Sequence, residues 1–310
     1  MPKLAVIIVS YQVRDLLREC LASVRAQRPA PDEVWVVENA STDGSAELVA
    51  REFPEARLVA AGGNVGFARA NNLAMRRSMA DVFALVNPDA ALPPGALRSA
   101  MEVLERHPDA GVVGVALANA DGTPQASRFA FPDLLNLLLE ASGLHRALVR
   151  LGFATMSGAP EVPGRESSAP WVSGACMLAT RALFERTGGF DESLFLYGEE
   201  LDWCWRAHAA GFGVWHTART RVLHHGGASG VLERGPLFVR NIEGRLAFMR
   251  RYRGAWQAAA ARELVTLGAL MRWIVWRVRA AFEGERPRAR TREQLERFAA
   301  VLAWRARGGR

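Results

Sequence analysis

The N-terminal part of the chain alternates predicted strands with segments of helical spacing, and no other feature restricts its fold as strongly. The predicted strands are Leu4–Val9, Glu33–Val37, Arg57–Ala61 and Val82–Val86. Regular alternation of strands and helices predicts a largely parallel sheet with helices on both faces. Sheets of this kind bind ligands in the loops at the carboxyl ends of their strands, so a site is expected there.

Polar segments follow all four predicted strands. They are Val9-Ser10-Tyr11-Gln12, Val37–Ser45, Asn64–Asn72 and Asn87-Pro88-Asp89. Each segment on its own has an ordinary structural explanation: a turn tyrosine, a helix cap at Ser41 or Thr42, a solvated first helical turn and a type I turn. Four such segments at successive strand ends are more specific, because they line one edge of one sheet.

The side chains in these segments suit a nucleotide with a diphosphate. The ring of Tyr11 can stack on a base, and Glu38 can accept a hydrogen bond from a base imide or a ribose hydroxyl. Polar residues at a helix N-terminus, with Arg69 one turn in, suit the diphosphate. Asp89 directly follows an apolar strand, where it suits Mg²⁺ or Mn²⁺, ions that combine one or two protein carboxylates with phosphate oxygens.

Three carboxylates, those of Glu199, Glu200 and Asp202, stand at the start of a helix predicted over 199–210. The helix dipole favours their ionised form there, which a general base requires. A structural explanation stays open as well, because acidic residues favour helix N-termini and Asp202 is spaced to pair with Arg206.

With these segments the sequence resembles the inverting glycosyltransferases of family two, which have the GT-A fold, and most of all their rhamnosyltransferase-like branch. Two further stretches, Gly188–Asp202 and His224–Ser229, carry the resemblance, which spans about residues 3–230. It implies an α/β fold with a Rossmann-like nucleotide-binding sheet and helices on both faces. Beyond it, the spacing predicts a helical C-terminal extension.

The resemblance implies a role for each matching residue. A nucleoside-diphosphate sugar would be held by Val9, Tyr11, Glu38, Asp43, Asn64, Gly66, Arg69, Asn72, Asn87 and Asp89. Asp89 would bind Mg²⁺ or Mn²⁺ together with His224. Glu200 would be the catalytic base, with glutamate where the family usually has aspartate, and Glu199 or Asp202 could share the task. The acceptor side would be formed by Trp171, Gly174, Ala175 and Tyr197.

The implied activity is a metal-dependent, inverting transfer of a sugar from a nucleoside-diphosphate sugar to a hydroxyl of a glycan or lipid-linked acceptor. Rhamnose is the sugar that the branch suggests, and cell-envelope polysaccharide synthesis is the expected setting. The alternative is a nucleotide-sugar-binding or scaffolding subunit in which Glu200 does not replace aspartate. An NAD-dependent oxidoreductase lacks support, since no G-x-G-x-x-G follows the first strand, and no motif predicts nucleic-acid binding.

The C-terminal part of the chain has a different charge balance from the rest. Residues 233–310 carry 18 basic and 7 acidic side chains, whereas residues 1–232 carry 21 basic and 25 acidic ones. Only helical patterns occur from Pro236 onward. We therefore divide the chain into a GT-A domain over 1–232 and a basic helical region over 233–310.

Residues 262–282, taken as a helix, place eight large apolar side chains within one arc of about 140°. The arc comprises Leu264, Leu267, Leu270, Met271, Ile274, Val275, Val278 and Phe282. A basic amphipathic helix favours an anionic membrane surface, while packing on the GT-A domain or on a second subunit, as in a homodimer, is an equal alternative. Cysteine usage and the lack of a signal peptide predict a cytoplasmic location, peripheral to the inner face of the plasma membrane.

Overall fold

The computed structural model describes residues 2–151, 153–159, 161–226, 234–283 and 288–309. The chain forms two compact units. The sheet unit comprises Met1–Ala130 and Gly158–Gly230, and the helical unit comprises Phe131–Ser157 and Val231–Arg310. Residues 131–157, which the sequence analysis assigns to the first domain, thus belong to the helical unit. The predicted boundary at 232/233 and the motif residues 227–229 lie outside the described residues.

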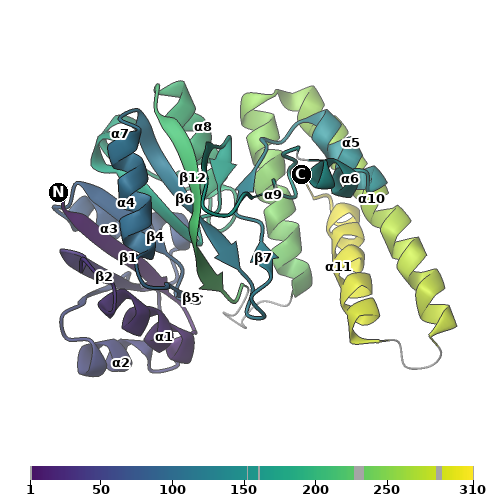
Figure 1. The fold of residues 1–310 in the computed structure, drawn as a ribbon. Helices are drawn as coiled ribbons and strands as arrows, with labels where there is room; N and C mark the ends of the chain where they lie inside the picture. Colours follow the sequence, from purple (N-terminus) through teal and green to yellow (C-terminus); the bar gives the residue numbers. More distant parts are fainter. Residues whose placement is uncertain (1, 152, 160, 227–233, 284–287, 310) are drawn as a thin grey trace. The chain divides into compact units, whose positions relative to one another are not determined.

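The sheet unit is built on a mixed sheet (Figure 1). Its main path runs β3-β2-β1-β4-β11-β6-β12-β5, and β7 and β9 are attached at its side. The strands are β1 (Leu4–Ser10), β2 (Glu33–Glu38), β3 (Arg57–Ala60), β4 (Val82–Val86), β5 (Ala90–Ala91), β6 (Ala110–Ala118), β7 (Pro124–Gln125), β9 (Glu166–Ser168), β11 (Cys176–Thr180) and β12 (Gly213–His224). A separate pair joins β8 (Arg128–Phe129) and β10 (Trp171–Val172).

The four N-terminal strands are parallel, as the sequence predicts. Strand β1 pairs with β2 and with β4, and β2 pairs with β3. Beyond β4 the sheet is mixed, because β11 lies antiparallel between β4 and β6, whereas β12 pairs with β6 in parallel. The C-terminal ends of β1 to β4 nevertheless meet at one edge of the sheet, where the polar loops lie.

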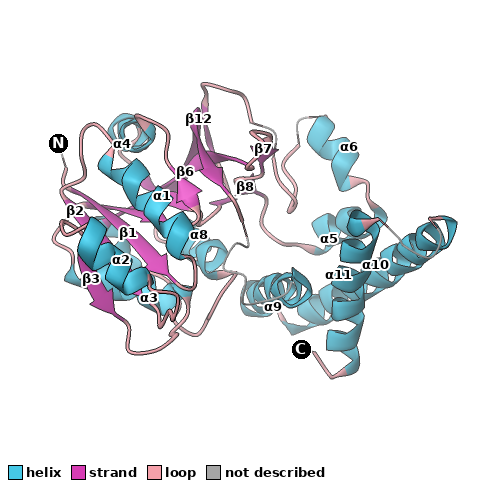
Figure 2. Ribbon diagram, turned by 90° about the horizontal axis from the view of Figure 1, so that it is seen from below, coloured by secondary structure: helices cyan, strands magenta, loops and turns pink. Residues whose placement is uncertain are grey.

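Helices cover both faces of the sheet (Figures 1 and 2). One face packs against α1 (Arg14–Arg25), α2 (Ser45–Glu52) and α4 (Ala96–Arg106) through a core that includes Val6 and Ile8. The other face contacts α3 (Phe67–Arg77), α7 (Arg181–Thr187) and α8 (Glu199–Ala209). Side chains alternate along β4, so its Phe83 points to this second face and meets Phe184 of α7 edge-on.

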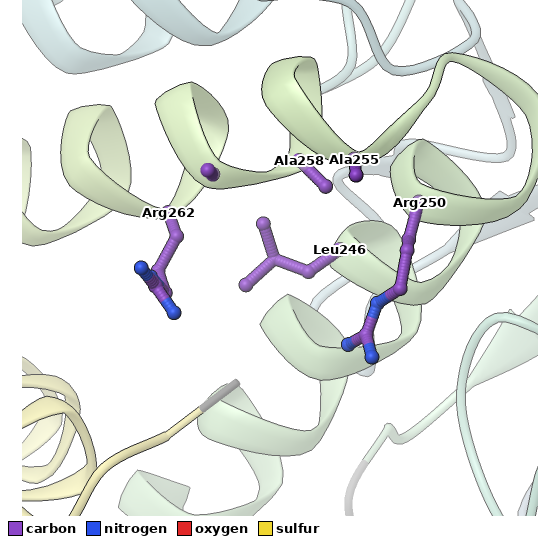
Figure 3. A pocket seen from close by; sticks show the side chains of 6 residues that line it. Leu246, Arg250, Ala255, Ala258 and Arg262 are labelled. Atoms are coloured by element: carbon purple, nitrogen blue, oxygen red, sulfur yellow. The ribbon is translucent and has the colours of Figure 1, made fainter.

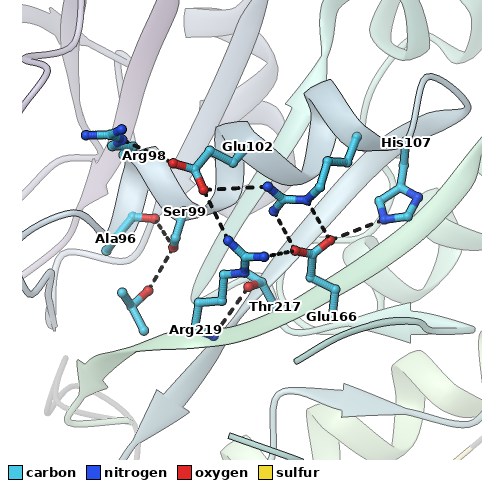
Figure 4. A network of polar contacts seen from close by, with 10 residues as sticks. Ala96, Arg98, Ser99, Glu102, His107, Glu166, Thr217 and Arg219 are labelled. Carbon is cyan, nitrogen blue, oxygen red and sulfur yellow. Dashed lines mark hydrogen bonds and ion pairs between the residues drawn. The ribbon is translucent and has the colours of Figure 1, made fainter. Parts of the chain in front are cut away.

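A network of charged side chains fastens α4 to the far part of the sheet (Figure 4). Arg106 of α4 and Arg219 of β12 both pair with Glu166 of β9. Glu102 of α4 pairs with the same two arginines. Arg219 lies where β12 is bulged, between Thr217 and Arg221.

One local prediction is wrong, and one helix was not predicted. The sequence places a helix cap at Ser41 or Thr42, but α2 begins at Ser45 after Gly44, with no side-chain cap. Ser41 and Thr42 instead accept hydrogen bonds from Gln12. The short helix α7 has no counterpart in the sequence analysis.

The helical unit consists of α5 (Leu134–Ser142), α6 (His145–Arg150), α9 (Arg234–Tyr252), α10 (Ala255–Phe282) and α11 (Ala289–Ala306). Its core includes Leu137, Met249, Val301 and Trp304. A cavity of about 190 Å³ lies between α9 and α10, lined by Leu246, three alanines and the arginines 250 and 262 (Figure 3). Although α10 has the length of a membrane span, neither it nor any other described helix is apolar enough to cross a bilayer.

Candidate active site

Hydrogen bonds between loops hold the polar edge of the sheet together. Asn39, after β2, donates to Oδ1 of Asn64 at 2.9 Å and accepts from the backbone N–H of Val65. Gln12, after β1, donates its backbone N–H to Oγ of Ser41. The loops after β1, β2 and β3 are therefore one connected surface, as expected from strands that end at one edge.

The residues predicted to hold the base lie at the ends of β1 and β2. Val9 is buried within β1, while Tyr11 is half-buried just beyond the strand. The carboxylate of Glu38 accepts the backbone N–H groups of Ala40 and Ser41, at 2.9 and 2.6 Å. Glu38 thus shapes its own loop in this structure.

Asp43 ties the second loop to the start of α1. Its carboxylate accepts the backbone N–H of Arg14 at 2.8 Å and both the N–H and the hydroxyl of Ser45. Burial by itself would raise the pKa of Asp43, but the hydrogen bonds from Ser45 and Arg14 lower it below its ordinary value. Its observed role is to cap α1 from a neighbouring loop.

The loop before α3 is interlocked with the chain that leads into α8. Gly66 has a φ of +83°, and a Cβ there would lie 2.5 Å from the backbone oxygen of Phe195. Asn72 is buried and bonds both the N–H and the carbonyl of Phe190. A Cβ on Gly189 would meet the Asn72 side chain at 2.5 Å. Asn72, predicted near the diphosphate, thus holds the segment before α8.

Arg69 stands at the N-terminal turn of α3 and keeps most of its side chain in solvent. Its nearest carboxylate oxygen, on Glu192, is 3.9 Å away, whereas Arg76 pairs with Glu192 at 2.9 Å. An exposed guanidinium at a helix N-terminus is free to approach a ligand phosphate. This placement agrees with the predicted position of Arg69 near a diphosphate.

Asp89 and His224 come together from sequence positions far apart. Asp89 lies between β4 and β5, and β5 pairs with the end of β12, where Ala90 is opposite His224. Oδ1 of Asp89 is 3.3 Å from Nε2 of His224. Asn87 donates to the same Nε2 from 3.2 Å. Both side chains of the pair are mostly buried.

Gln125, which the sequence analysis does not single out, determines which nitrogen of His224 carries hydrogen. Its Nε2 donates to Asn119, so its Oε1 faces Nδ1 of His224 at 2.7 Å. An amide oxygen only accepts, so Nδ1 is the donor. The single lone pair of the neutral ring is then on Nε2, where it accepts from Asn87, so a metal bound at Nε2 would replace that hydrogen bond.

This arrangement brings two hydrogen-bond acceptors, His224 Nε2 and Asp89 Oδ1, against each other. Two acceptors 3.3 Å apart repel unless a proton or a metal cation lies between them. Neighbouring ligands of an octahedral Mg²⁺ lie about 3 Å apart, so the spacing fits a divalent metal. The described residues contain no group of three or more metal-ligating His, Cys, Asp or Glu side chains. The pair therefore fits a metal whose remaining ligands come from elsewhere.

The predicted acidic cluster lies on the first turn of α8, and its three members differ. Asp202 is buried against Arg206, which binds it at 2.7 Å and also donates to two backbone carbonyls. Glu199 is 3% exposed, and its Oε2 has no hydrogen-bond partner within the described part of the chain. Burial, and then repulsion from Glu200, raise the pKa of Glu199 well above its ordinary value.

Tyr197 connects the acidic cluster with Asp89. Burial raises the pKa of its phenol, and the charges of Glu200, Glu199 and Asp89 raise it further. All three carboxyl groups are thus within electrostatic reach of one hydroxyl. Tyr197 has a φ of +69°, a costly conformation for a non-glycine residue and one that concentrates at functional sites.

The turn at Gly174 and Ala175 also borders both groups. The backbone oxygen of Ala175 accepts the N–H of Asn87 at 2.9 Å. A Cβ on Gly174 would lie 3.8 Å from Cβ and Cδ of Glu200. Trp171 lies further back, stacked on Phe129 and bonded through Nε1 to the carbonyl of Ala130. Of the predicted acceptor-side residues, Gly174 lies against Glu200 and Ala175 bonds the segment that carries Asp89, whereas Trp171 contacts Phe129 and Ala130.

Comparison with known proteins decides the family. Residues 5–156 match the model described as glycosyl transferase family 2. The N-acetylglucosaminyl-diphospho-decaprenol L-rhamnosyltransferase of Mycobacterium tuberculosis is 30% identical over 237 residues, 72% of this chain and 76% of that protein. The chain belongs to glycosyltransferase family 2. Rhamnosyltransferase WbbL of Escherichia coli is 23% identical over 71% of this chain and 82% of that protein. The predicted enzyme class, a rhamnosyltransferase-like glycosyltransferase, is confirmed.

Solved structures confirm the fold. A mannosyltransferase from Pyrobaculum calidifontis, in complex with GDP-Man and Mn²⁺, has a TM-score of 0.60 at 19% identity, covering 99% of this chain and 86% of that one. GalNAc-T7 with UDP, GalNAc and Mn²⁺ has a TM-score of 0.57 at 12% identity, covering 79% and 47%. The family 2 chain is thus a GT-A fold with additional C-terminal helices.

Proposed function

We propose that this glycosyltransferase inverts the sugar's configuration, uses a divalent metal held by Asp89 and His224, and takes Glu200 as its general base. The observation that carries the proposal is that the carboxyl groups of Asp89, Glu199 and Glu200 all act electrostatically on one phenol, that of Tyr197, while His224 lies 3.3 Å from Asp89. A metal-side group and a base-side group around one space are what a single displacement at an anomeric carbon requires.

Glu200 is proposed as the base because the pKa of its neighbour Glu199 is raised, so Glu199 binds a proton more readily. The raised pKa of Glu199 favours its neutral form, so Glu200 is the member of the pair that we expect to carry the negative charge. Glu200 would take the proton of the acceptor hydroxyl as the oxygen attacks opposite the leaving group. Asp202, held by Arg206, would position the first turn of α8 rather than accept the proton.

The donor would lie along the polar edge of the sheet. Tyr11 would stack on the base, and Arg69 would approach the diphosphate from the N-terminus of α3. Asp89 and His224 would hold Mg²⁺ or Mn²⁺, with diphosphate oxygens as its further ligands. When bound, the metal would neutralise the charge that develops on the departing nucleoside diphosphate.

The relatives support a class of donor and acceptor. By its name, the Mycobacterium tuberculosis relative is an L-rhamnosyltransferase that acts on N-acetylglucosaminyl-diphospho-decaprenol. We propose a rhamnosyl nucleoside diphosphate as donor, with dTDP-rhamnose as the first to test, and a lipid-linked sugar diphosphate as acceptor. The setting would be cell-envelope glycan synthesis on the cytoplasmic side of the membrane.

The test combines the full chain with dTDP-rhamnose, a polyprenyl-diphospho-N-acetylglucosamine and Mn²⁺. We expect transfer that stops on chelation and returns with Mn²⁺, and a product whose anomeric configuration, read by NMR, is opposite to the donor's. Asp89→Ala should lower the rate at least about 100-fold. Asp15→Ala, at a side chain that is 85% exposed, is the control. Transfer that survives chelation contradicts the metal proposal, and donor binding without transfer supports the scaffolding alternative.

A further inference from the structure

Helix α10 has an apolar face that the described chain leaves uncovered. The exposed large apolar side chains of this face are Leu267, Leu270, Met271, Ile274, Val275, Val278 and Phe282. Val275 is 64% exposed and Phe282 87%. We call this set the α10 arc. It contains seven of the eight residues that helical spacing places together, and the eighth, Leu264, packs on the core of the helical unit.

The opposite face of α10 is already occupied within its own unit. Ala261 and Ala269 are buried in the core of this unit, and Trp273 and Trp276 pack against it. A Cβ on the buried Gly268 would meet Ala141 of α5 at 3.1 Å. The helix therefore has its packing partners on one side, and the α10 arc does not contribute to the core of the helical unit.

The charges around the α10 arc are basic. From Leu264 to Phe282 the sequence has no acidic residue. At about 100° per residue, Arg277 lies beside one edge of the arc and Arg279 beside the other. The guanidinium of Arg277 lies 5.5 Å from the ring centroid of Trp273, and that of Arg279 lies 5.1 Å from Trp276. Arg279 also pairs with Glu283, which follows the arc.

The apolar surface continues from α10 onto α5. An open groove of about 570 Å³ is lined by Leu134 of α5 and by Leu264, Leu267 and Leu270 of α10, among others. Leu135 and Leu138 of α5 are 65% and 52% exposed. Exposed aliphatic side chains on two neighbouring helices make a surface too broad to be ordinary for a protein in water.

We propose that the α10 arc lies in the interface of an anionic lipid bilayer, parallel to its plane. An apolar arc with arginines at both edges buries its side chains among acyl chains and places the guanidinium groups at the level of the phosphates. A second copy of the chain is the weaker occupant, because it would bring two regions with 18 basic and 7 acidic side chains each against one another. Anionic lipid neutralises the same charge. The inference concerns the helical unit alone and is independent of the proposed reaction.

The test measures partitioning of the full chain onto vesicles of phosphatidylglycerol and phosphatidylcholine by co-sedimentation. The wild type should sediment with these vesicles and be released in large part by high salt, while vesicles of phosphatidylcholine alone should bind much less. Val275→Glu should weaken partitioning about tenfold, because a side chain that enters the lipid is lost. Ala299→Glu, an exposed position on α11, introduces the same charge elsewhere in the unit and should change partitioning little.

Three results overturn the proposal. If Val275→Glu and Ala299→Glu weaken vesicle partitioning equally, the effect comes from net charge alone and not from the α10 arc. If the wild-type chain does not sediment with anionic vesicles, the bilayer is excluded as the partner of the α10 arc. A wild-type dimer in light scattering that Val275→Glu dissociates, without vesicle binding, would assign the α10 arc to a second copy. Circular dichroism of both variants confirms that each remains folded.

Discussion

Glu199→Gln should stabilise the protein at neutral and higher pH, although it changes a residue of the active-site helix. Glu199 is 3% exposed, and its pKa is raised by burial and then by repulsion from Glu200. A carboxyl group with a raised pKa makes the folded state bind more protons than the unfolded state. The free energy of unfolding therefore falls as pH rises from the unfolded value near 4.5 toward the folded one. Glutamine keeps the shape and removes this loss.

The magnitude follows from proton linkage. One group that is protonated in the folded state and ionised in the unfolded state gives a slope of at most about 1.4 kcal/mol per pH unit. The advantage of Glu199→Gln over the wild type should be small below about pH 4.5, grow through the acidic range and level off above the folded pKa. Each kcal/mol corresponds to about 2–4 °C in Tm for a unit of this size.

The assay is thermal unfolding of the full chain, followed by circular dichroism across a pH series. Glu47→Gln, the same substitution at an exposed position of α2, is the control for the loss of one carboxyl group. A Glu199→Gln variant that is less stable than the wild type at neutral pH would refute the reasoning, and so would an advantage that does not vary with pH. Either result would mean that Glu199 is ionised in the folded protein.

Two further substitutions test other parts of the site. Gln125→Leu removes the acceptor that holds Nδ1 of His224, so it should weaken Mn²⁺ binding about 10–100-fold. Electron paramagnetic resonance in the presence of a nucleoside diphosphate measures this binding. Unchanged Mn²⁺ affinity would contradict the role of Gln125. Gly66→Ala should destabilise by about 1–3 kcal/mol more than Gly62→Ala. Both glycines have a φ near +80°, but only the Cβ at Gly66 meets Phe195, so equal losses in urea unfolding would show that the contact costs nothing.

The strand ends proposed for the donor side could be predicted from the sequence because β1, β2 and β4 are largely buried, although β3 is mostly exposed. A buried parallel strand reads as a short apolar run, and the polar residues that follow it stand out. Tyr11, Arg69 and Asp89 are predicted as site residues in this way. The acidic pair on α8 was found by its position at a helix start. For these residues the local pattern and the tertiary position agree.

The sequence could not separate ligand-facing side chains from those that hold loops together. Asp43 and Asn72 match the family's polar positions, yet Asp43 caps α1 and Asn72 holds Phe190. Gln125 gave no signal, because it lies on a strand of two residues in a stretch without clear periodicity. A hydrogen-bond partner distant in sequence is set by tertiary packing, which no local pattern encodes.

The C-terminal helices also show that a sequence pattern does not reveal tertiary contacts. The helical spacing predicted which side chains of α10 share an arc, but not whether another part of the chain covers them. Among the described residues, none covers Val275 or Phe282, and both side chains are exposed. The structure groups 131–157 with the C-terminal helices for a related reason: the packing of Leu137 on the helical core joins segments far apart in sequence.

The most direct test of the account compares Glu200→Gln with Glu199→Gln, two equal changes at adjacent positions. Sugar transfer and the binding of a nucleoside diphosphate with Mn²⁺ are measured for both. We predict that Glu200→Gln lowers the transfer rate by about 10²–10⁴-fold and leaves nucleotide binding nearly intact, because it removes proton acceptance and keeps the shape. Glu199→Gln should retain most of the rate. Wild-type transfer by Glu200→Gln, or an inactive Glu199→Gln, would contradict Glu200 as the base.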